Sequence, residues 1–264
     1  LSGTKNLTAN IIGFHIHLPF EIAAWSLQKI FLMDATTYIM ALLLIAFIKY
    51  VPAEKLEIHI GTVKERIKMG FDYLKNKPEL LLFGVVTMSI FIVLIVEERL
   101  LMPLYVNNHL QQGADVYASS GIFYSIGAII SGLFIRKVFK QTNAVKSIIL
   151  LMLLTVFILL ITSFSKSIII FFAFSLLIGI TNAGTRILRI TYLFERIPNN
   201  RMGRTGSVFS VISTLTQVLF IGIFSIPFFS IGSQVTWAYF IDAIFISLCI
   251  LALLSYYKKL VVEK

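Results

Sequence analysis

The stretch FIVLIVEERLLMPLY, residues 91–105, places three charged side chains, Glu97, Glu98 and Arg99, inside an otherwise apolar run. A charge in hydrocarbon is costly, so membrane proteins keep one only where it has a partner or a task. Either a helix ends at Val96, or it continues through the trio with its charges directed at something. The surrounding sequence has to decide between these two interpretations.

The composition indicates an integral membrane protein. Of 264 residues, 58% are hydrophobic and 14% are charged, whereas soluble domains have roughly 45–50% and about 25%. The net charge of +10 is explained better by basic cytoplasmic loops than by nucleic acid binding. A single cysteine, Cys249, excludes an internal disulfide framework. Because no P-loop, Cys/His cluster or catalytic constellation appears, we expect neither an enzyme nor a resident metal or cofactor.

Seven stretches reach the roughly 20 mostly apolar residues that a spanning helix needs. They are residues 30–50, 80–106, 117–134, 147–164, 167–190, 206–229 and 235–257. An eighth candidate, residues 8–27, is weaker because it contains His15, His17, Pro19 and Glu21. The runs are too long, and lack the alternation, for a membrane β-barrel. We therefore predict an all-α polytopic bundle of about seven to eight transmembrane helices.

Loop charges give the orientation, since Lys and Arg gather on the cytoplasmic side. Basic residues fill the connections 51–79, 135–146 and 186–204 and the tail 258–264. The intervening connections 107–116 and 230–234 have none, and the turn near Ser165 has only Lys166. This strict alternation predicts that the basic connections are cytoplasmic.

One connection is long enough for an element of its own. Within residues 51–79, Val63, Ile67, Phe71 and Leu74 have helical spacing, with Lys and Arg on the other faces. This pattern predicts an amphipathic helix on the inner membrane surface. The alternative is a solvated charged linker.

Four local patterns carry a resemblance to a known family. They are MDATTYIMALLLI (33–45), KMGFDYLKNKPEL (68–80), SGLFIRKVFK (131–140, with Gly132 and Arg136) and ERIPNNRMGRTGSVFS (195–210, with Pro198, Arg201, Gly203 and Arg204). In this order and spacing they resemble the sixth helix to the eleventh of the major facilitator superfamily, closest to its drug- and macrolide-efflux branch. Two departures are Met202, interposed between Arg201 and Gly203, and residues 8–27, which lack the glycine and proline pattern of the fifth helix.

The resemblance implies a division of the chain and a function. Residues 1–50 would end the N-terminal half of a twelve-helix transporter, residues 51–79 would form the cytoplasmic central loop, and residues 80–264 would be helices seven to twelve. The rest of the N-terminal half would be a missing partner. The expected function is proton-coupled export of drugs or hydrophobic metabolites across the cell (inner) membrane by alternating access. The alternatives are an importer of the same fold, and a membrane subunit or sensor without autonomous transport.

In this frame the charged trio lies on helix seven, toward the outer side. Thr87 and Glu98 are eleven residues apart and are predicted to share a face, with Glu97 and Arg99 about 100° to either side. Glu98, or Glu97, would face the central cavity as a proton or cation site. The alternative is that Arg99 neutralises one of them in a structural ion pair.

Other polar residues of the spans are candidates for the cavity or for helix packing. Ser207, Ser210, Thr214 and Gln217 form a stripe that would line the cavity and bind substrate, or join helices by hydrogen bonds. Gly121, Ser125, Ala128 and Gly132 form a small-residue ridge predicted to pack against a neighbouring helix, beside which Tyr124 could reach the cavity.

The remaining charged residues have simpler interpretations. Asp34 is expected at a wet helix end, and Asp242 could pair with Arg99. Arg186 and Arg189 are expected at the inner end of helix ten, reaching toward lipid phosphates.

Overall fold

The computed structural model describes residues 9–11, 14–16, 26–48 and 62–262. The chain divides into two units, Leu1–His59 and Ile60–Lys264. Within the described residues, seven helices are long and apolar enough to cross a membrane. This confirms the predicted all-α polytopic bundle.

The first unit contains a short hairpin and one helix. Strands β1 (Ala9–Ile11) and β2 (Phe14–Ile16) pair antiparallel, with Asn10 opposite His15. The predicted weak span over residues 8–27 is therefore wrong as a continuous helix, and its part from 17 to 25 lies outside the described residues. Helix α1 (Leu27–Ala46) corresponds to the predicted span 30–50 and has no buried residue.

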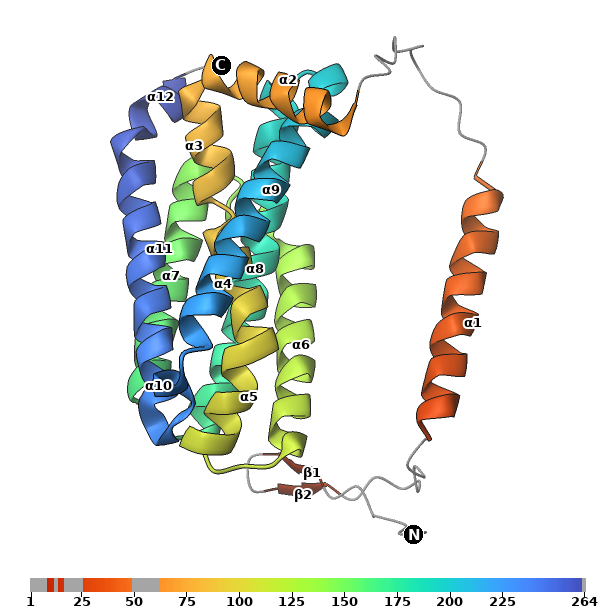
Figure 1. Cartoon of the computed structure of the whole chain (residues 1–264), viewed down its shortest axis with the longest axis vertical. Helices are drawn as coiled ribbons and strands as arrows, with labels where there is room; N and C mark the ends of the chain where they lie inside the picture. Colours follow the sequence, from red (N-terminus) through yellow and green to blue (C-terminus); the bar gives the residue numbers. More distant parts are fainter. Residues whose placement is uncertain (1–8, 12–13, 17–25, 49–61, 263–264) are drawn as a thin grey trace. The chain divides into compact units, whose positions relative to one another are not determined.

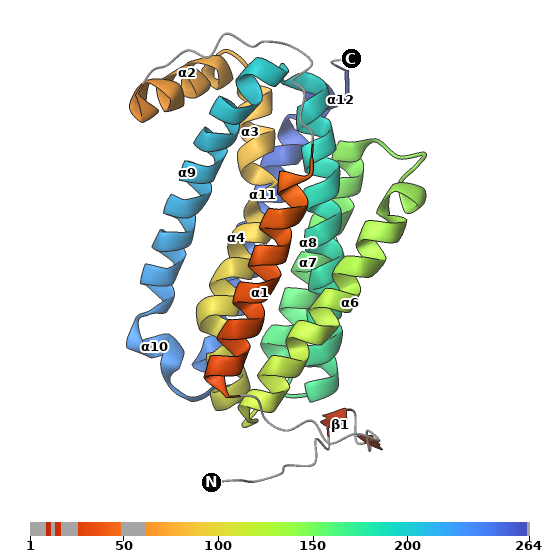
Figure 2. The same ribbon diagram turned by 90° about the vertical axis from the view of Figure 1, so that its right-hand side faces the viewer.

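The second unit is a bundle whose long helices alternate in direction (Figures 1 and 2). Its elements are α2 (Val63–Lys75), α3 (Pro78–Val86), α4 (Ser89–Val96), η1 (Glu97–Leu101), α5 (Met102–Leu104), η2 (Tyr105–His109), α6 (Ala114–Val138), α7 (Ala144–Phe164), α8 (Ile168–Arg196), α9 (Asn199–Phe224), α10 (Pro227–Ser230), η3 (Gly232–Val235), α11 (Thr236–Ser255) and α12 (Tyr257–Val262). Helices α2 and α12 lie at one end with the basic α8–α9 connection, and α10 lies at the other (Figure 1). We call these the inner and outer ends.

One span, Pro78–His109, runs through α3, α4, η1, α5 and η2, and we call it helix seven. Near its inner third the backbone tightens, and the N–H of Met88 donates to the carbonyl of Val85 at 3.1 Å. Further on, η1 and η2 are π-helical, with the N–H of Met102 donating to the carbonyl of Glu97. Because the helix continues to His109, the interpretation that it ends at Val96 is wrong. Each change of helix type also rotates the side chains that follow it.

Helices α6 and α8 pack at very short range through glycines. A Cβ added at Gly127 or Gly179 would collide with a main-chain carbonyl of the facing helix. The buried face of α6 contains Ser120, Gly127, Ser131 and Ile135. Gly121 and Gly132, from the predicted ridge, have open space where a Cβ would stand. The ridge was therefore assigned to the wrong face, because α6 carries small residues on two faces and only the contact distinguishes them.

Helix α2 confirms the predicted helix within the 51–79 connection. Thr62 and Glu65 form a reciprocal capping box at its start, which satisfies two free N–H groups. Gly70 lies against the main chain of Arg204 in α9, and Leu74 is fully buried. Phe71, on the predicted apolar face, is 46% exposed. The buried face of α2 therefore packs on α9.

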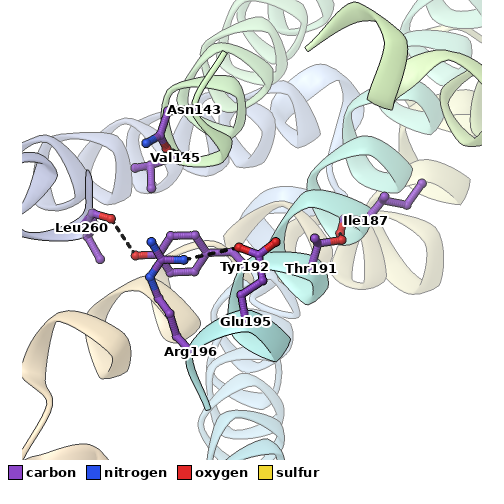
Figure 3. Close-up of polar contacts among 8 residues, drawn as sticks. All are labelled: Asn143, Val145, Ile187, Thr191, Tyr192, Glu195, Arg196 and Leu260. Atoms are coloured by element: carbon purple, nitrogen blue, oxygen red, sulfur yellow. Dashed lines mark hydrogen bonds and ion pairs between the residues drawn. The ribbon is translucent and has the colours of Figure 1, made fainter. Parts of the chain in front are cut away.

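A hydrogen bond joins α12 to the inner end of α8, where Tyr192, Glu195 and Arg196 contact one another (Figure 3). The hydroxyl of Tyr192 donates to the carbonyl of Leu260 at 3.0 Å. The guanidinium carbon of Arg196 lies 3.8 Å from the centre of the Tyr192 ring, and its Nη1 lies 3.7 Å from Oε2 of Glu195. The charge of Arg196 is therefore accommodated by two neighbouring side chains, the Tyr192 ring and the Glu195 carboxylate.

Candidate functional site

Two carboxyl groups lie inside the bundle without a counter-charge from any described residue. Glu97, the first residue of η1, and Asp242, on α11, are both 0% exposed. All four carboxyl oxygens are buried without a hydrogen-bond partner among the described residues. The two groups are close enough for their charges to interact. Arg99 is exposed and, within residues 62–262, forms an ion pair with neither, so the predicted pairs of Arg99 with a glutamate or with Asp242 are not formed there.

Titratable side chains extend from this acid pair toward the outer end. Tyr239 lies one turn before Asp242 on α11, and its buried hydroxyl has no hydrogen-bond partner among the described residues. Its ring centre lies 4.9 Å from that of Tyr105, which lies 4.9 Å from the His109 ring. His109 Nε2 is 2.9 Å from the carbonyl oxygen of Ser165, in the outer connection. We call Tyr239, Tyr105 and His109 the aromatic line.

Glu98 points away from the acid pair into a different environment. It is exposed and belongs to a hollow of about 190 Å³ between helix seven, α6 and α8, which we call the outer hollow. Its wall includes Leu94, Met102, Tyr117, Tyr124 and Ile178. The adjacent residues Glu97 and Glu98 thus connect the closed acid pair to an open, mainly apolar recess.

A second hollow, of about 400 Å³, lies nearer the inner end between helix seven and α8. Its wall includes Thr87, Phe91, Asn182, Thr185, Arg186 and Arg189, and we call it the arginine hollow. The side-chain amide of Asn182 donates to the hydroxyl of Tyr124 at 2.8 Å, which links the walls of the two hollows. Thr87 and Glu98 therefore line different hollows. Phe91 lines the hollow of Thr87, Leu94 lines that of Glu98, and both hollows are bounded by α8. The shared face of Thr87 and Glu98 stays a prediction.

The polar stripe of α9 forms no bond to another described helix. Ser210 and Thr214 are exposed, and the amide of Gln217 donates to Ser213 of the same helix at 3.2 Å. None of the three is among the lining residues of the outer hollow or the arginine hollow. That the stripe lines a transport cavity stays a prediction.

The basic motif at the start of α9 joins this helix to α2. Pro198 precedes α9, and its carbonyl accepts from the N–H of Arg201 at 2.9 Å. The Arg201 guanidinium carbon lies 4.8 Å from the centre of the Tyr73 ring. Arg204 Nη1 donates to the sulfur of Met69 at 3.7 Å. These contacts hold α2 across the inner end of α9.

The other motif residues are exposed in the described part of the chain. Gly132 and Arg136 lie near the inner end of α6, with exposed side chains or backbone. Gly203 has open space around its Cα. Nothing in the described residues explains a preference for glycine at 132 or 203.

The sequence matches the family described as Major Facilitator Superfamily over residues 18–221, most of the chain. The chain belongs to this superfamily. It is therefore a multi-pass membrane protein of the secondary-transporter class, as the resemblance implied. No curated protein and no solved structure gives a match to this member of the Major Facilitator Superfamily.

Two parts of the site escaped the sequence analysis. Asp242 was considered only as a partner of Arg99, although it is the sole acid of its span and such a residue is by default a functional candidate. Arg186 and Arg189 were placed at the end of helix ten because the apolar run stops at Ile190. Helix α8 continues about two turns further, to Arg196. The expected position of both arginines at the helix end is therefore wrong.

Proposed function

We propose that this superfamily member is a proton-coupled exporter of drugs or hydrophobic metabolites in the cell (inner) membrane. It would work by alternating access, together with the N-terminal half of the same protein. The observation that carries proton coupling is the fully buried acid pair of Glu97 and Asp242, which has no cation, hydrogen bond or ion pair among the described residues.

The physical argument concerns the energy of buried charge. An ionised carboxylate in a dry interior loses its hydration and gains nothing from a neighbouring carboxylate. Two such groups side by side avoid this energy when they hold a proton. The acid pair is thus suited to bind a proton in the closed arrangement and to release it when water reaches the pair.

The outer end of the bundle offers a group that could exchange protons with water. Histidine is the side chain best suited to take up and release protons near neutral pH, and His109 lies beside the carbonyl of Ser165 in the outer connection. The rings of Tyr239 and Tyr105 lie between His109 and the pair, but the Tyr105 hydroxyl donates to the carbonyls of Thr162 and Ser165 and the Tyr239 hydroxyl has no partner among the described residues. We therefore propose that protons reach Glu97 and Asp242 from the outer side through water that enters when the bundle opens.

The coupling to substrate would pass through helix seven. Glu97 and Glu98 are successive residues of the π-helical element η1, and such elements are frequent at functional sites. A change in the charge of Glu97 would move Glu98 and the wall of the outer hollow. The mainly apolar wall of that hollow suits a hydrophobic substrate. Export rather than import is proposed from the resemblance of residues 33–45 to the sixth helix of the drug-efflux branch.

Transport in vesicles tests the proposal. The full-length protein is reconstituted, a pH gradient is imposed, and a panel of hydrophobic drugs is offered. Glu97→Gln and Asp242→Asn, which imitate the protonated acids, are expected to abolish gradient-driven uptake while leaving facilitated exchange. Asp115→Asn, at an exposed acid of α6, is the matched control. Full coupling in both acid variants would refute a proton site at the pair, and full coupling in Glu98→Gln would remove Glu98 from the mechanism.

Infrared spectroscopy supplies a readout that does not need a substrate. A protonated buried carboxyl group has a carbonyl stretching band distinct from that of a carboxylate. We expect this band in wild-type protein at neutral pH and expect it to weaken in Glu97→Gln and in Asp242→Asn. An unchanged band in both variants would contradict the assignment.

A further inference from the structure

The arginine hollow contains two positive charges that no described residue neutralises. Arg186 and Arg189 lie one turn apart on α8 and line the same hollow. Among the residues that the structure describes, neither guanidinium forms an ion pair or a hydrogen bond, and Nε of Arg189 is buried. The charge that acts most strongly on Arg189 is that of Arg186, a repulsion.

The position of these arginines argues against a role at the lipid surface. Arg186 precedes the helix end at Arg196 by ten residues, about 15 Å along the axis. Arg196 shows what an arginine at this end does, since it contacts the Tyr192 ring and Glu195. Arg189, which is partly buried, and Arg186, which is exposed, instead line the recess between helix seven and α8. Arginine is effectively always charged in proteins, so an anion is the natural complement to both.

The wall of the hollow that α8 forms is polar, and the wall that helix seven forms is mainly apolar. Thr185 is 2% exposed, and its hydroxyl has no hydrogen-bond partner among the described residues. Asn182 adds an amide to the same wall. The opposite wall comes from Met88, Ile90 and Phe91 of helix seven. A volume of about 400 Å³ falls in the usual range for small-molecule sites.

We propose that the arginine hollow binds the anionic group of an amphiphilic organic anion, a carboxylate or phosphate whose apolar body lies on Phe91 and its neighbours. Planar guanidinium groups hold such oxygens by paired hydrogen bonds. Thr185 donates a further hydrogen bond, which satisfies a buried hydroxyl. The proposal rests on the proposed transport function for its role and narrows the substrate class, since it selects acids among the drugs or hydrophobic metabolites.

Binding to the purified full-length protein in neutral detergent tests the site without any gradient. The probes are naphthalene-2-carboxylate and two matched compounds, neutral 2-naphthylmethanol and cationic 2-naphthylmethylamine. Calorimetry should detect the acid, with a loss of affinity on the order of tenfold for Arg186→Gln and again for Arg189→Gln. Lys140→Gln, which removes an exposed charge after α6, should bind like wild type. Thermal unfolding of each variant confirms that it is folded.

Two outcomes of the calorimetry would overturn the proposal. Equal affinity for the acid and the alcohol would mean that the hollow does not recognise charge. Acid binding unchanged in folded Arg186→Gln and Arg189→Gln would place the anion elsewhere.

A parallel series in nanodiscs compares phosphatidylglycerol with phosphatidylcholine. If only phosphatidylglycerol, and not the naphthoate, stabilises wild type over the arginine variants, the occupant is a lipid headgroup and the soluble-anion proposal fails. Because no transport is measured, failure here leaves the proton-coupling proposal standing.

Discussion

The acid pair and the arginine hollow carry opposite charges and are built in opposite ways. Glu97 and Asp242 are sealed, each 0% exposed, whereas Arg186 and Arg189 line an open recess. A carboxyl group can become neutral by taking a proton, so a closed site tolerates it without a partner. A guanidinium cannot lose its charge under ordinary conditions. In this bundle, a group that can become neutral by binding a proton lies in a closed site, whereas a group that keeps its charge lies in an open one.

The largest expected effect comes from placing a permanent charge in the closed site. Glu97→Arg combined with Asp242→Asn leaves a guanidinium among buried apolar groups without a carboxylate. We expect a loss of at least about 2.5–3.5 kcal/mol in the free energy of unfolding. Thermal unfolding in detergent measures it. The control Glu97→Gln with Asp242→Asn should stay within about 1 kcal/mol of wild type. Equal stability of both double variants would show that the site is not closed.

The contact between α6 and α8 supports the walls of the outer hollow and the arginine hollow, and a change there is expected to have the next largest effect on stability. In Gly179→Val the added side chain meets the main-chain carbonyl of Tyr124. We expect a destabilisation of about 1–3 kcal/mol, read as a lower midpoint of thermal unfolding. Gly121→Val, which enters open space in the described bundle, is the control. A Gly179→Val protein as stable as wild type would mean that the helices separate easily there.

The hydrogen bond between the two hollows should have a moderate effect. Tyr124→Phe removes the acceptor of the Asn182 amide, which is 8% exposed. The expected cost is about 0.5–1.5 kcal/mol in the free energy of unfolding. Ser125→Ala, whose hydroxyl bonds only its own helix at Gly121, serves as the comparison. If Ser125→Ala lowers the free energy of unfolding more than Tyr124→Phe does, the hydrogen bond between the hollows contributes little to stability.

The smallest effect is expected at the partnered arginine of the inner end. Glu195→Gln removes the ion pair with Arg196, whose members are 18% and 65% exposed. We expect a change of at most about 0.5 kcal/mol, because solvent screens such pairs and Arg196 keeps the Tyr192 ring. A change larger than that of Tyr124→Phe, in the same unfolding assay, would show that this pair is not solvated.

Sequence reasoning located the spans well because each depends on a local property, the length of an apolar run. All seven strong candidates correspond to helices, although the ends differ, as at α8. The weak candidate over residues 8–27 is wrong for residues 9–11 and 14–16, which pair as two antiparallel strands.

Faces were predicted less well than spans. Ideal helical geometry predicts that Thr87 and Glu98 share a face, and the structure places them in two successive hollows along helix seven, both bounded by α8. The small-residue ridge of α6 was assigned to Gly121 and Gly132, whereas Gly127 makes the contact. Successive residues of an α-helix point about 100° apart, so neighbouring residues belong to different faces. The local sequence does not indicate which of two similar faces contacts the next helix.

The sequence by itself determined that this chain is a polytopic helical membrane protein of the Major Facilitator Superfamily, since hydrophobic length, loop charge and motif order are properties of the linear chain. Only the tertiary structure decided that Glu97 meets Asp242 rather than Arg99, and that Arg186 and Arg189 line a hollow. Glu97 and Asp242 come from different helices, and Arg186 and Arg189 lie on a helix that continues past the end of its apolar run. Their proximity depends on how helix seven, α8 and α11 pack, which is a property of the folded bundle.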